Sequence, residues 1–479
     1  MPPFVRKNFL VYLNLSNKYA NQIKVEIKIK WFFWHKNSME DKKGGVEEMI
    51  KVIDGNIKFL AAERPLKTPE LYKSNDCYGH AHVLKKYANL NENYQIKGVL
   101  EHAAMVYDHV WSFDIAVPLP VIYCFSDYRF LFLRQLTNKV LFAIGPSIHY
   151  AEALLSNSEL EGLKKQLGKT LLVFPPHSSW SIYVDFDVKY IISVIKEFEK
   201  EFENILICLG WRDVLRNIDT LFIREGYTCV TAGNVYDMQF LNRLKTLILL
   251  SSHTMSFSFG THIGFCVYLN RPHWICKGIK QKVKIPDQIK DTAVYHGTPL
   301  SHNLVEYVLE AFKEPQDTVT SRQMQVTDML WGVSHIKNPQ ELRELFSIAE
   351  DMYQKKYLPC DRKNFIGLCQ IFDYFETNEL KKGYVLLDYL KRVGISNKWL
   401  NLVKGFLYVK EGNFLKAEKK IKNLLKDKGI LGEKARILMD AIEKREKNLE
   451  LSLKKDIMSL YPKPDIFSMR KINLPWRNI

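Results

Sequence analysis

The sequence predicts an α/β protein with two doubly wound parallel sheets, followed by an all-α region of helical repeats. Short apolar segments alternate with amphipathic segments from about residue 44 to 330, as strands and helices do around parallel sheets. From roughly residue 338 onward only helical spacing remains. The chain has 479 residues, which is enough for two or three domains.

Eight short apolar segments are the predicted strands. Amphipathic stretches such as residues 188–204 lie between several of them and predict crossover helices. We place the boundary between the two sheets at residues 146–168, where the sequence indicates a polar helical crossover. The predicted strands are residues 96–100, 121–125, 140–144, 170–174, 205–209, 228–232, 246–250 and 273–276.

The C-terminal region is predicted to be helical. Its helices are expected at residues 339–357, 362–380, 383–393, 397–411, 413–427 and 431–450. Gly405, Tyr408, Gly412, Phe414 and Ala417 have the spacing of a tetratricopeptide repeat (TPR), with small residues where paired helices approach closely. The predicted domains are an N-terminal extension (1–45), an α/β domain (46–160), a second α/β domain (161–335), a TPR-like region (338–455) and a tail (456–479).

Composition narrows the class of protein. The apolar fraction of 47% predicts a folded chain, and no apolar run reaches the roughly 18–20 residues of a membrane span. Eight cysteines without a CxxC pair favour reduced thiols, so we expect a cytoplasmic protein.

The net charge of +16 fits nucleic acid, an anionic membrane surface or a phosphorylated substrate. No basic helix with stacking aromatic residues is present, so we expect no nucleic-acid partner. The positive charge is compatible with peripheral contact at the inner membrane face. The C-terminal helices could bind a protein partner, because helical repeats present surfaces for docking.

The most informative segment is residues 247–276. An apolar run at 247–250 is predicted to be a strand that ends in a hydroxyl-rich turn containing Ser256 and Ser258. Gly260 and Thr261 then open a predicted helix, whose N-terminus offers free N–H groups to a phosphate. The alternative is a plain strand–turn–helix connection with a capping serine.

Other polar residues follow predicted strands, at the edge where open α/β sheets bind ligands. Glu101 and His102 follow the first strand and are candidates for a general base toward a sugar hydroxyl. His177 and Ser178 follow the strand at 170–174 and are candidates for contact with a phosphate or ribose. The alternatives are a solvated turn at the first position and a helix cap at the second.

Trp211 and Arg212 follow the strand at 205–209. Trp211 is a candidate for covering a planar base and Arg212 for pairing with a phosphate. The alternative is a surface turn with a helical pair between Asp213 and Arg216. No recognised metal-ligand spacing and no GxSxG motif is present, so we expect neither a metal site nor a nucleophilic serine.

Four ordered segments carry a resemblance to a known family. They are VLEHAAM; CFSDYRFLFLRQL followed by KVLFAIGPSIHYAEAL; GKTLLVFPPHSS; and SSHTMSFSFGTHIGFCVYLNRPHWI. In this order the sequence resembles bacterial glycosyltransferases of the GT-B type that build capsular or other surface polysaccharides. The resemblance covers roughly residues 95–280. The chain departs from the family at Ala103, where glycine is usual, and lacks a Glu-x7-Glu donor motif.

The resemblance implies two facing Rossmann-like domains, with the acceptor on the first domain and a nucleotide-sugar on the second. It implies sugar transfer from that co-substrate to a glycan or lipid-linked acceptor, with no obligatory metal. His102 would be the base, with Glu101 as the alternative. The implied donor-site residues are His177, Ser178, Arg212, Ser256, Ser258, Gly260 and Thr261. Two alternatives stay open, namely a polyol-phosphate transferase of the same two-domain plan and a non-catalytic TPR-type scaffold.

Overall fold

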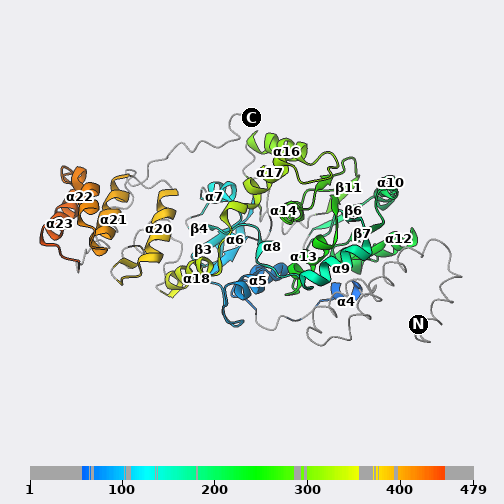
Figure 1. The fold of residues 1–479 in the computed structure, drawn as a ribbon, viewed down its shortest axis with the longest axis horizontal. Coiled ribbons are helices and arrows are strands. Elements are labelled where there is room, and N and C mark those ends of the chain that lie inside the picture. The colour runs from blue at the N-terminus through cyan, green and yellow to red at the C-terminus, as the bar shows by residue number, and fades with distance from the viewer. Residues whose placement is uncertain are drawn as a thin grey trace.

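A computed structural model gives the fold (Figure 1). The structure describes residues 57–63, 65, 69–101, 103, 109–134, 136–137, 139–179, 182–284, 293–295, 299–354, 371, 374–375, 377–392 and 397–447. The predicted N-terminal extension, the predicted tail, most of the helix expected at 362–380 and the candidate base His102 lie outside these residues.

The first sheet has three parallel strands in the order β1-β3-β4. All three strands are buried along their length, as expected for a parallel sheet with covered faces. The elements up to β4 are α4 (Ile57–Ala61), η2 (Lys73–Gly79), α5 (His80–Tyr87), β1 (Gly98–Leu100), β2 (His109–Trp111), α6 (Ser112–Ala116), β3 (Val121–Cys124), α7 (Asp127–Leu133) and β4 (Val140–Ala143).

The free edge of β1 is covered by one side chain. The amide of Asn75 in η2 donates from Nδ2 to the carbonyl of Gly98 at 2.8 Å and accepts at Oδ1 from the N–H of Leu100 at 2.8 Å. These two bonds replace those that a neighbouring strand would make, so the edge does not expose unpaired backbone groups.

The second sheet has five parallel strands in the order β10-β9-β5-β7-β8. The elements from β4 to the end of this part are α8 (Ser147–Tyr150), α9 (Asn157–Leu167), β5 (Thr170–Phe174), β6 (Tyr183–Phe186), α10 (Val188–Phe198), β7 (Asn204–Cys208), α11 (Trp211–Leu215), α12 (Asp219–Arg224), β8 (Thr228–Val230), α13 (Phe240–Leu250), β9 (His253–Ser256), α14 (His262–Tyr268), β10 (His273–Ile275), β11 (Gln281–Lys284), β12 (Ala293–Tyr295), α16 (Pro299–Ala311), α17 (Ser321–Trp331) and η3 (Val333–His335).

The strand order of the second sheet reverses once. From β5 the chain adds β7 and β8 on one side, and it then crosses to add β9 and β10 on the other side. Counted along the chain from the β8 edge, this is the order 3-2-1-4-5 of a doubly wound sheet. The reversal lies between β5 and β9, and a ligand site is expected outside the carboxyl ends of these two strands.

Each face of the second sheet packs into its own core. Leu171 and Val173 of β5 point into a cluster with Ile191 of α10, whereas Leu172 and Phe174 belong to a larger cluster. That larger cluster also contains the first sheet and the C-terminal helices, so it joins both parts of the molecule. The alternation follows the period of two that side chains have along a strand.

The predicted strand at 246–250 is wrong. These residues form the second half of α13, and Leu244, Leu247 and Ile248 are buried at helical spacing. The strand is β9, which lies inside the segment predicted as a hydroxyl-rich turn. The other seven predicted strands are confirmed to within two residues, and α9 confirms the helical crossover between the sheets.

The C-terminal helices extend from the first sheet to one end of the molecule (Figure 1). The α18 helix packs on the first sheet, where the hydroxyl of Tyr123 donates to the carbonyl of Leu345 at 3.2 Å. The elements are α18 (Pro339–Gln354), α20 (Leu380–Arg392), α21 (Asn397–Lys410), α22 (Phe414–Ile421), η4 (Lys422–Leu424) and α23 (Ile430–Lys444). None of the helices in the described ranges combines the length and apolar character needed to cross a bilayer.

The predicted helix pair around Gly405 is present. A Cβ on Gly405 of α21 would overlap the side chain of Ile421, so the glycine permits close packing of α21 on α22. Gly412 has a φ of +75° in the turn between the two helices. The structure therefore contains the helix–turn–helix unit, and its assignment as a TPR stays a prediction.

Candidate functional site

The loops that follow β5, β7 and β9 meet at the carboxyl edge of the second sheet. His177 follows β5, and its Cβ would lie 3.0 Å from a Cβ on Gly210, which follows β7. The N–H of Phe257, just after β9, donates to the carbonyl of Phe174 at 3.2 Å. The three strand ends proposed from the sequence as ligand contacts are therefore neighbours.

His177 lies exposed at this edge. The surrounding protein lowers the pKa of His177 by displacing water from its imidazole, and the nearby Asp213 carboxylate opposes that shift. The side chain is nevertheless exposed to solvent. His177 therefore presents a neutral imidazole there, which can donate or accept a hydrogen bond.

Ser178 fixes the loop after β5. Its hydroxyl donates to Oδ1 of Asp213 and its backbone N–H to Oδ2, each at 2.9 Å. The same hydroxyl accepts from the N–H of Val184 at 3.1 Å, and Ser178 is buried. Burial raises the pKa of Asp213, and the bonds from Ser178 oppose that shift. Ser178 is therefore a positioning residue in this structure rather than a residue that faces a ligand.

Trp211 and Arg212 lie at different depths. Trp211 is 6% exposed and packs in the core, so its ring has no open face for a base. The guanidinium of Arg212 stacks over the Trp211 ring at 4.9 Å and over the Tyr183 ring at 5.0 Å. Its Nη1 also donates to the Tyr183 hydroxyl at 2.6 Å. We therefore remove Trp211 from the candidate ligand contacts and retain Arg212.

Sequence reasoning missed Tyr183. This residue begins β6, which pairs antiparallel with β11 in a two-stranded ribbon beside the carboxyl edge. Tyr183 is 42% exposed, so it is the accessible aromatic ring next to Arg212. The only signal in the sequence was the alternation of side-chain character over the four residues of β6. Such alternation does not show that Arg212, which is distant in the sequence, lies against the Tyr183 ring.

Ser256 is buried within the sheet. Its hydroxyl lies 3.0 Å from Nε2 of His273, and the Thr254 hydroxyl lies 2.8 Å from Nδ1 of the same ring. These bonds satisfy the polar atoms of β9 and β10 inside the core. Ser256 therefore holds two strands together, and it does not reach the surface where a donor would bind.

The turn before α14 remains the accessible part of the predicted donor segment. Ser258, Gly260 and Thr261 are partly exposed, and α14 begins at His262, directly after the start that the sequence predicted at Gly260 and Thr261. The His262 ring stacks on Phe174 with the ring centres 4.3 Å apart. A Cβ on Gly260 would lie 2.6 Å from this ring, so only glycine fits above it.

His262 is a buried imidazole under that turn. In the described part of the chain its Nε2 atom has no hydrogen-bond partner. Burial and the neighbouring histidines hold the pKa of His262 well below its usual value, so the ring is neutral. The turn thus rests on a rigid aromatic pair formed by Phe174 and His262.

A cavity of about 250 Å³ opens beside the turn. Phe257 and Ser258 form part of its wall after β9, and Cys276 and Lys277 form another part after β10. Leu309 of α16 closes one side. The residues that line the cavity are mainly apolar, with Ser258 and Lys277 among them, which suits a ring with polar substituents.

Glu101 is engaged in a buried ion pair. Its Oε1 accepts from Nε and Nη2 of Arg129, each at 2.6 Å, and its Oε2 accepts from the N–H of Phe125 at 3.3 Å. The side chains of Glu101 and Arg129 are 11% and 2% exposed. Both carboxylate oxygens of Glu101 are thus engaged within the fold, which leaves His102 as the candidate base.

The C-terminal end of α17 joins the carboxyl edges of both sheets. The indole of Trp331 donates to the carbonyl of Thr261, beyond β9, at 2.9 Å. Gly332 has a φ of +68° and lies directly against the carbonyl of Phe125, beyond β3. The end of α17 therefore links Thr261 of the predicted donor segment to Phe125, whose N–H donates to Glu101. Gly332 is the C-cap of α17, and the sequence gave no signal for the contacts that it and Trp331 make.

Within the described ranges, no three His, Cys, Asp or Glu side chains gather as metal ligands would. Comparisons of the chain with protein-family models, with curated proteins and with solved structures find no match.

The buried His273 predicts a pH dependence of stability. Burial lowers the pKa of His273 from 6.5 to about 3, so between these values the unfolded chain binds a proton that the folded protein does not. The free energy of unfolding should therefore rise with pH across this window, by up to ~1.4 kcal/mol per pH unit from this residue. Urea unfolding from pH 4 to 7 should show a smaller slope for His273→Gln. Parallel curves for the two proteins would contradict this.

Proposed function

We propose that this protein is a glycosyltransferase that moves a sugar from a nucleotide-activated donor to a surface polysaccharide or another glycan. The observation that carries the proposal is the reversal of strand order between β5 and β9, with Arg212, His177 and the 258–261 turn beside it. Under this proposal the two sheets are the cores of facing Rossmann-like domains of the GT-B type, and the C-terminal helices are TPR-like.

The donor would bind along the carboxyl edge of the second sheet. Arg212, braced by Tyr183, supplies a fixed positive charge for a diphosphate, because a guanidinium pairs with phosphate in a bidentate manner. His177 and Ser258 add neutral hydrogen-bonding groups at the same edge. The cavity beside Ser258 has room for one ring of the donor.

The acceptor would approach from the first sheet. A base, for which His102 is the candidate, takes the proton of the acceptor hydroxyl while the oxygen attacks the anomeric carbon of the donor sugar. The bond from that carbon to the phosphate oxygen breaks, and the nucleoside diphosphate leaves with the electron pair. Arg212 stabilises the negative charge that develops on the leaving group.

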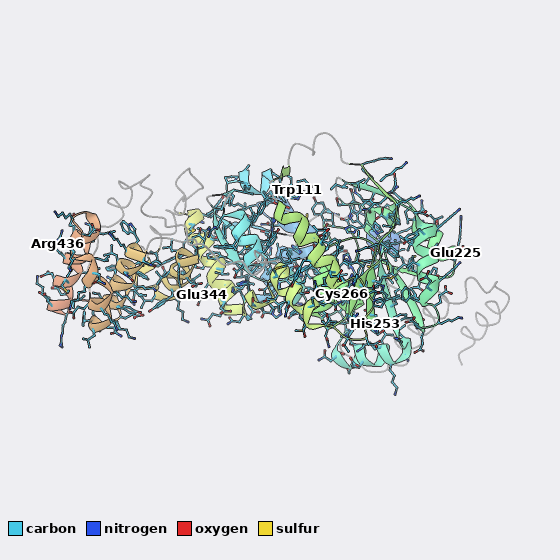
Figure 2. All side chains as sticks on the ribbon, turned by 90° about the horizontal axis from the view of Figure 1, so that it is seen from above. Trp111, Glu225, His253, Cys266, Glu344 and Arg436 are labelled. Atoms are coloured by element: carbon cyan, nitrogen blue, oxygen red, sulfur yellow. The ribbon has the colours of Figure 1, made fainter. Side chains whose placement is uncertain are left out.

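The test is nucleotide binding. We expect one class among UDP-, GDP-, CDP- and CMP-linked ligands to raise the melting temperature, because a ligand that binds only the folded state stabilises it. Arg212→Ala should weaken the affinity about 10- to 100-fold, since it removes charge-assisted hydrogen bonds. Arg436→Ala on α23 is the matched control and should bind normally, because Arg436 is exposed at the far end of the molecule (Figure 2).

The outcomes separate the remaining functions. A product that carries a phosphodiester to a polyol, in place of a glycosidic bond, would assign the protein to the polyol-phosphate transferases. Absence of saturable binding with every nucleotide and nucleotide-sugar would reject an enzyme of this type. It would favour the non-catalytic scaffold, in which the α/β part only supports the helices.

A further inference from the structure

The C-terminal helices carry much of the positive charge of the chain. Residues 377–447 contain 18 lysine and arginine residues against nine aspartate and glutamate residues. This excess is more than half of the net charge of +16. Figure 2 shows Arg436 of this region at the end of the molecule opposite Glu225, with Glu344 of α18 between them. The charge is therefore concentrated away from the proposed donor site.

One helix face combines this charge with an exposed apolar side chain. Leu415 of α22 is 83% exposed, and the side chains of Lys416, Lys419 and Lys422 are exposed beside it. Leu415, Lys419 and Lys422 follow one another at intervals of four and three residues, which keeps them on one side of the helix. We name Leu415, Lys416, Lys419, Lys422 and the following exposed Lys426 the α22 patch.

The opposite face of α22 is fixed in the core. Ala417 and Ile421 are fully buried, and Gly405 of α21 packs against Ile421. The patch therefore cannot turn inward without breaking the α21–α22 contact. The packing of Ala417 and Ile421 therefore holds Leu415 outward, toward solvent.

The lysines of the patch are not neutralised by the protein. Lys398 pairs with Asp427 and Lys444 with Asp440 in the same group of helices. Across the described residues, no acidic side chain forms an ion pair with any lysine of the α22 patch. Lysines without acidic partners around one protruding leucine form a surface that attracts negative charge. Covering this surface also removes the apolar side chain of Leu415 from water.

We propose that the α22 patch docks on an anionic phospholipid surface. Leu415 enters the boundary between headgroups and acyl chains, while the lysine ammonium groups stay among the lipid phosphates. The long lysine side chains allow this, because their methylene stems lie along the apolar layer while the charges remain in water. This inference is independent of the sugar-transfer proposal.

The composition of the patch favours a lipid surface over nucleic acid. A nucleic-acid surface gains little from an aliphatic side chain, and it is usually read by arginines and by stacked aromatic rings. The α22 patch has neither of these and has a leucine at its tip. A membrane interface uses both components of the α22 patch, because its one apolar side chain and its several basic residues act together there.

The test is sedimentation of the full-length protein with vesicles. We expect binding to vesicles of phosphatidylglycerol and phosphatidylcholine in equal parts, no binding to phosphatidylcholine alone, and weaker binding as salt is added. The double variant Lys419→Ala/Lys422→Ala should lose about 25-fold in affinity, on the basis of roughly fivefold per lysine near an anionic surface. Leu415→Ser should lose about tenfold, because the buried apolar area is lost.

A matched control separates the effect of the α22 patch on vesicle binding from the effect of the overall positive charge. The double variant Lys398→Ala/Lys444→Ala also removes two exposed lysines from these helices, but both are paired outside the patch. It should bind anionic vesicles nearly as well as the wild type. Three results would overturn the proposal: equal losses for both double variants, no binding of the wild type to anionic vesicles, or tighter binding to single-stranded RNA that Leu415→Ser does not change.

Discussion

Replacing Arg129 with alanine should lower the free energy of unfolding by about 3–5 kcal/mol. Arg129 and Glu101 are 2% and 11% exposed, and the guanidinium holds Oε1 of Glu101 through two bonds of 2.6 Å. Truncating the arginine leaves a buried carboxylate without this cation, and that is the costly way to break a buried pair. Urea unfolding of both proteins in one buffer at pH 7 measures the difference.

The chain offers a matched exposed pair as control. Lys86 and Glu152 are joined at 2.6 Å, but their side chains are 55% and 63% exposed. Lys86→Ala should therefore cost less than about 1 kcal/mol, because water already screens this pair. In the double variant Arg129→Met/Glu101→Leu most of the lost stability should return, since apolar residues replace both charges. If Arg129→Ala costs no more than Lys86→Ala, Glu101 is not held as described and becomes a candidate base again.

Strands were predictable where the apolar run was continuous. The five residues of β5, from Thr170 to Phe174, are all buried, and their sequence has no helical alternative of useful length. The prediction failed at α13 because the run at 247–250 was considered apart from Leu241 and Leu244, which extend it with helical spacing. β9 was missed because two of its four residues carry hydroxyl groups. Those groups are satisfied by His273, which lies 17 to 19 residues further along the chain.

The candidate site was predictable as a place and less so as a set of contacts. The sequence located the strand ends, and the sheet order brings the ends of β5, β7 and β9 together. It could not show that Ser178 is bound by Asp213, which lies 35 residues away. Likewise, Arg129 lies 28 residues from Glu101, and Trp331 lies 70 residues from Thr261. Contacts at such separations depend on tertiary packing, which leaves no periodic signal in the sequence.

The structure therefore divides the predicted donor residues by role. Ser178 and Ser256 are bonded within the fold, and both are buried. His177, Arg212 and the turn at 258–261 stay accessible at the edge. The first group is expected to affect stability when replaced, and the second group to affect binding with little effect on stability. This division makes the proposed function testable by measuring both quantities on each variant.

Replacing Gly332 with alanine should cost about 3 kcal/mol or more of the free energy of unfolding. The φ of +68° is strained for any residue with a Cβ, which costs of order 1–3 kcal/mol by itself. A Cβ at this position would also overlap the carbonyl of Phe125, so α17 would have to move away from the first sheet. Thermal and urea unfolding of the variant measure the loss.

Gly429→Ala is the matched control, because Gly429 has a φ of −96° and the nearest atom to its added Cβ is a side-chain oxygen of Asp427 at 3.3 Å. This change should cost less than about 1 kcal/mol. Gly332→Ala should also weaken nucleotide binding at temperatures where the variant is folded, since Trp331 next to it holds the carbonyl of Thr261 in the turn. A variant that loses stability but binds nucleotide normally would show that α17 supports the core without positioning the site. A variant as stable as Gly429→Ala would show that α17 does not lock the two sheets together.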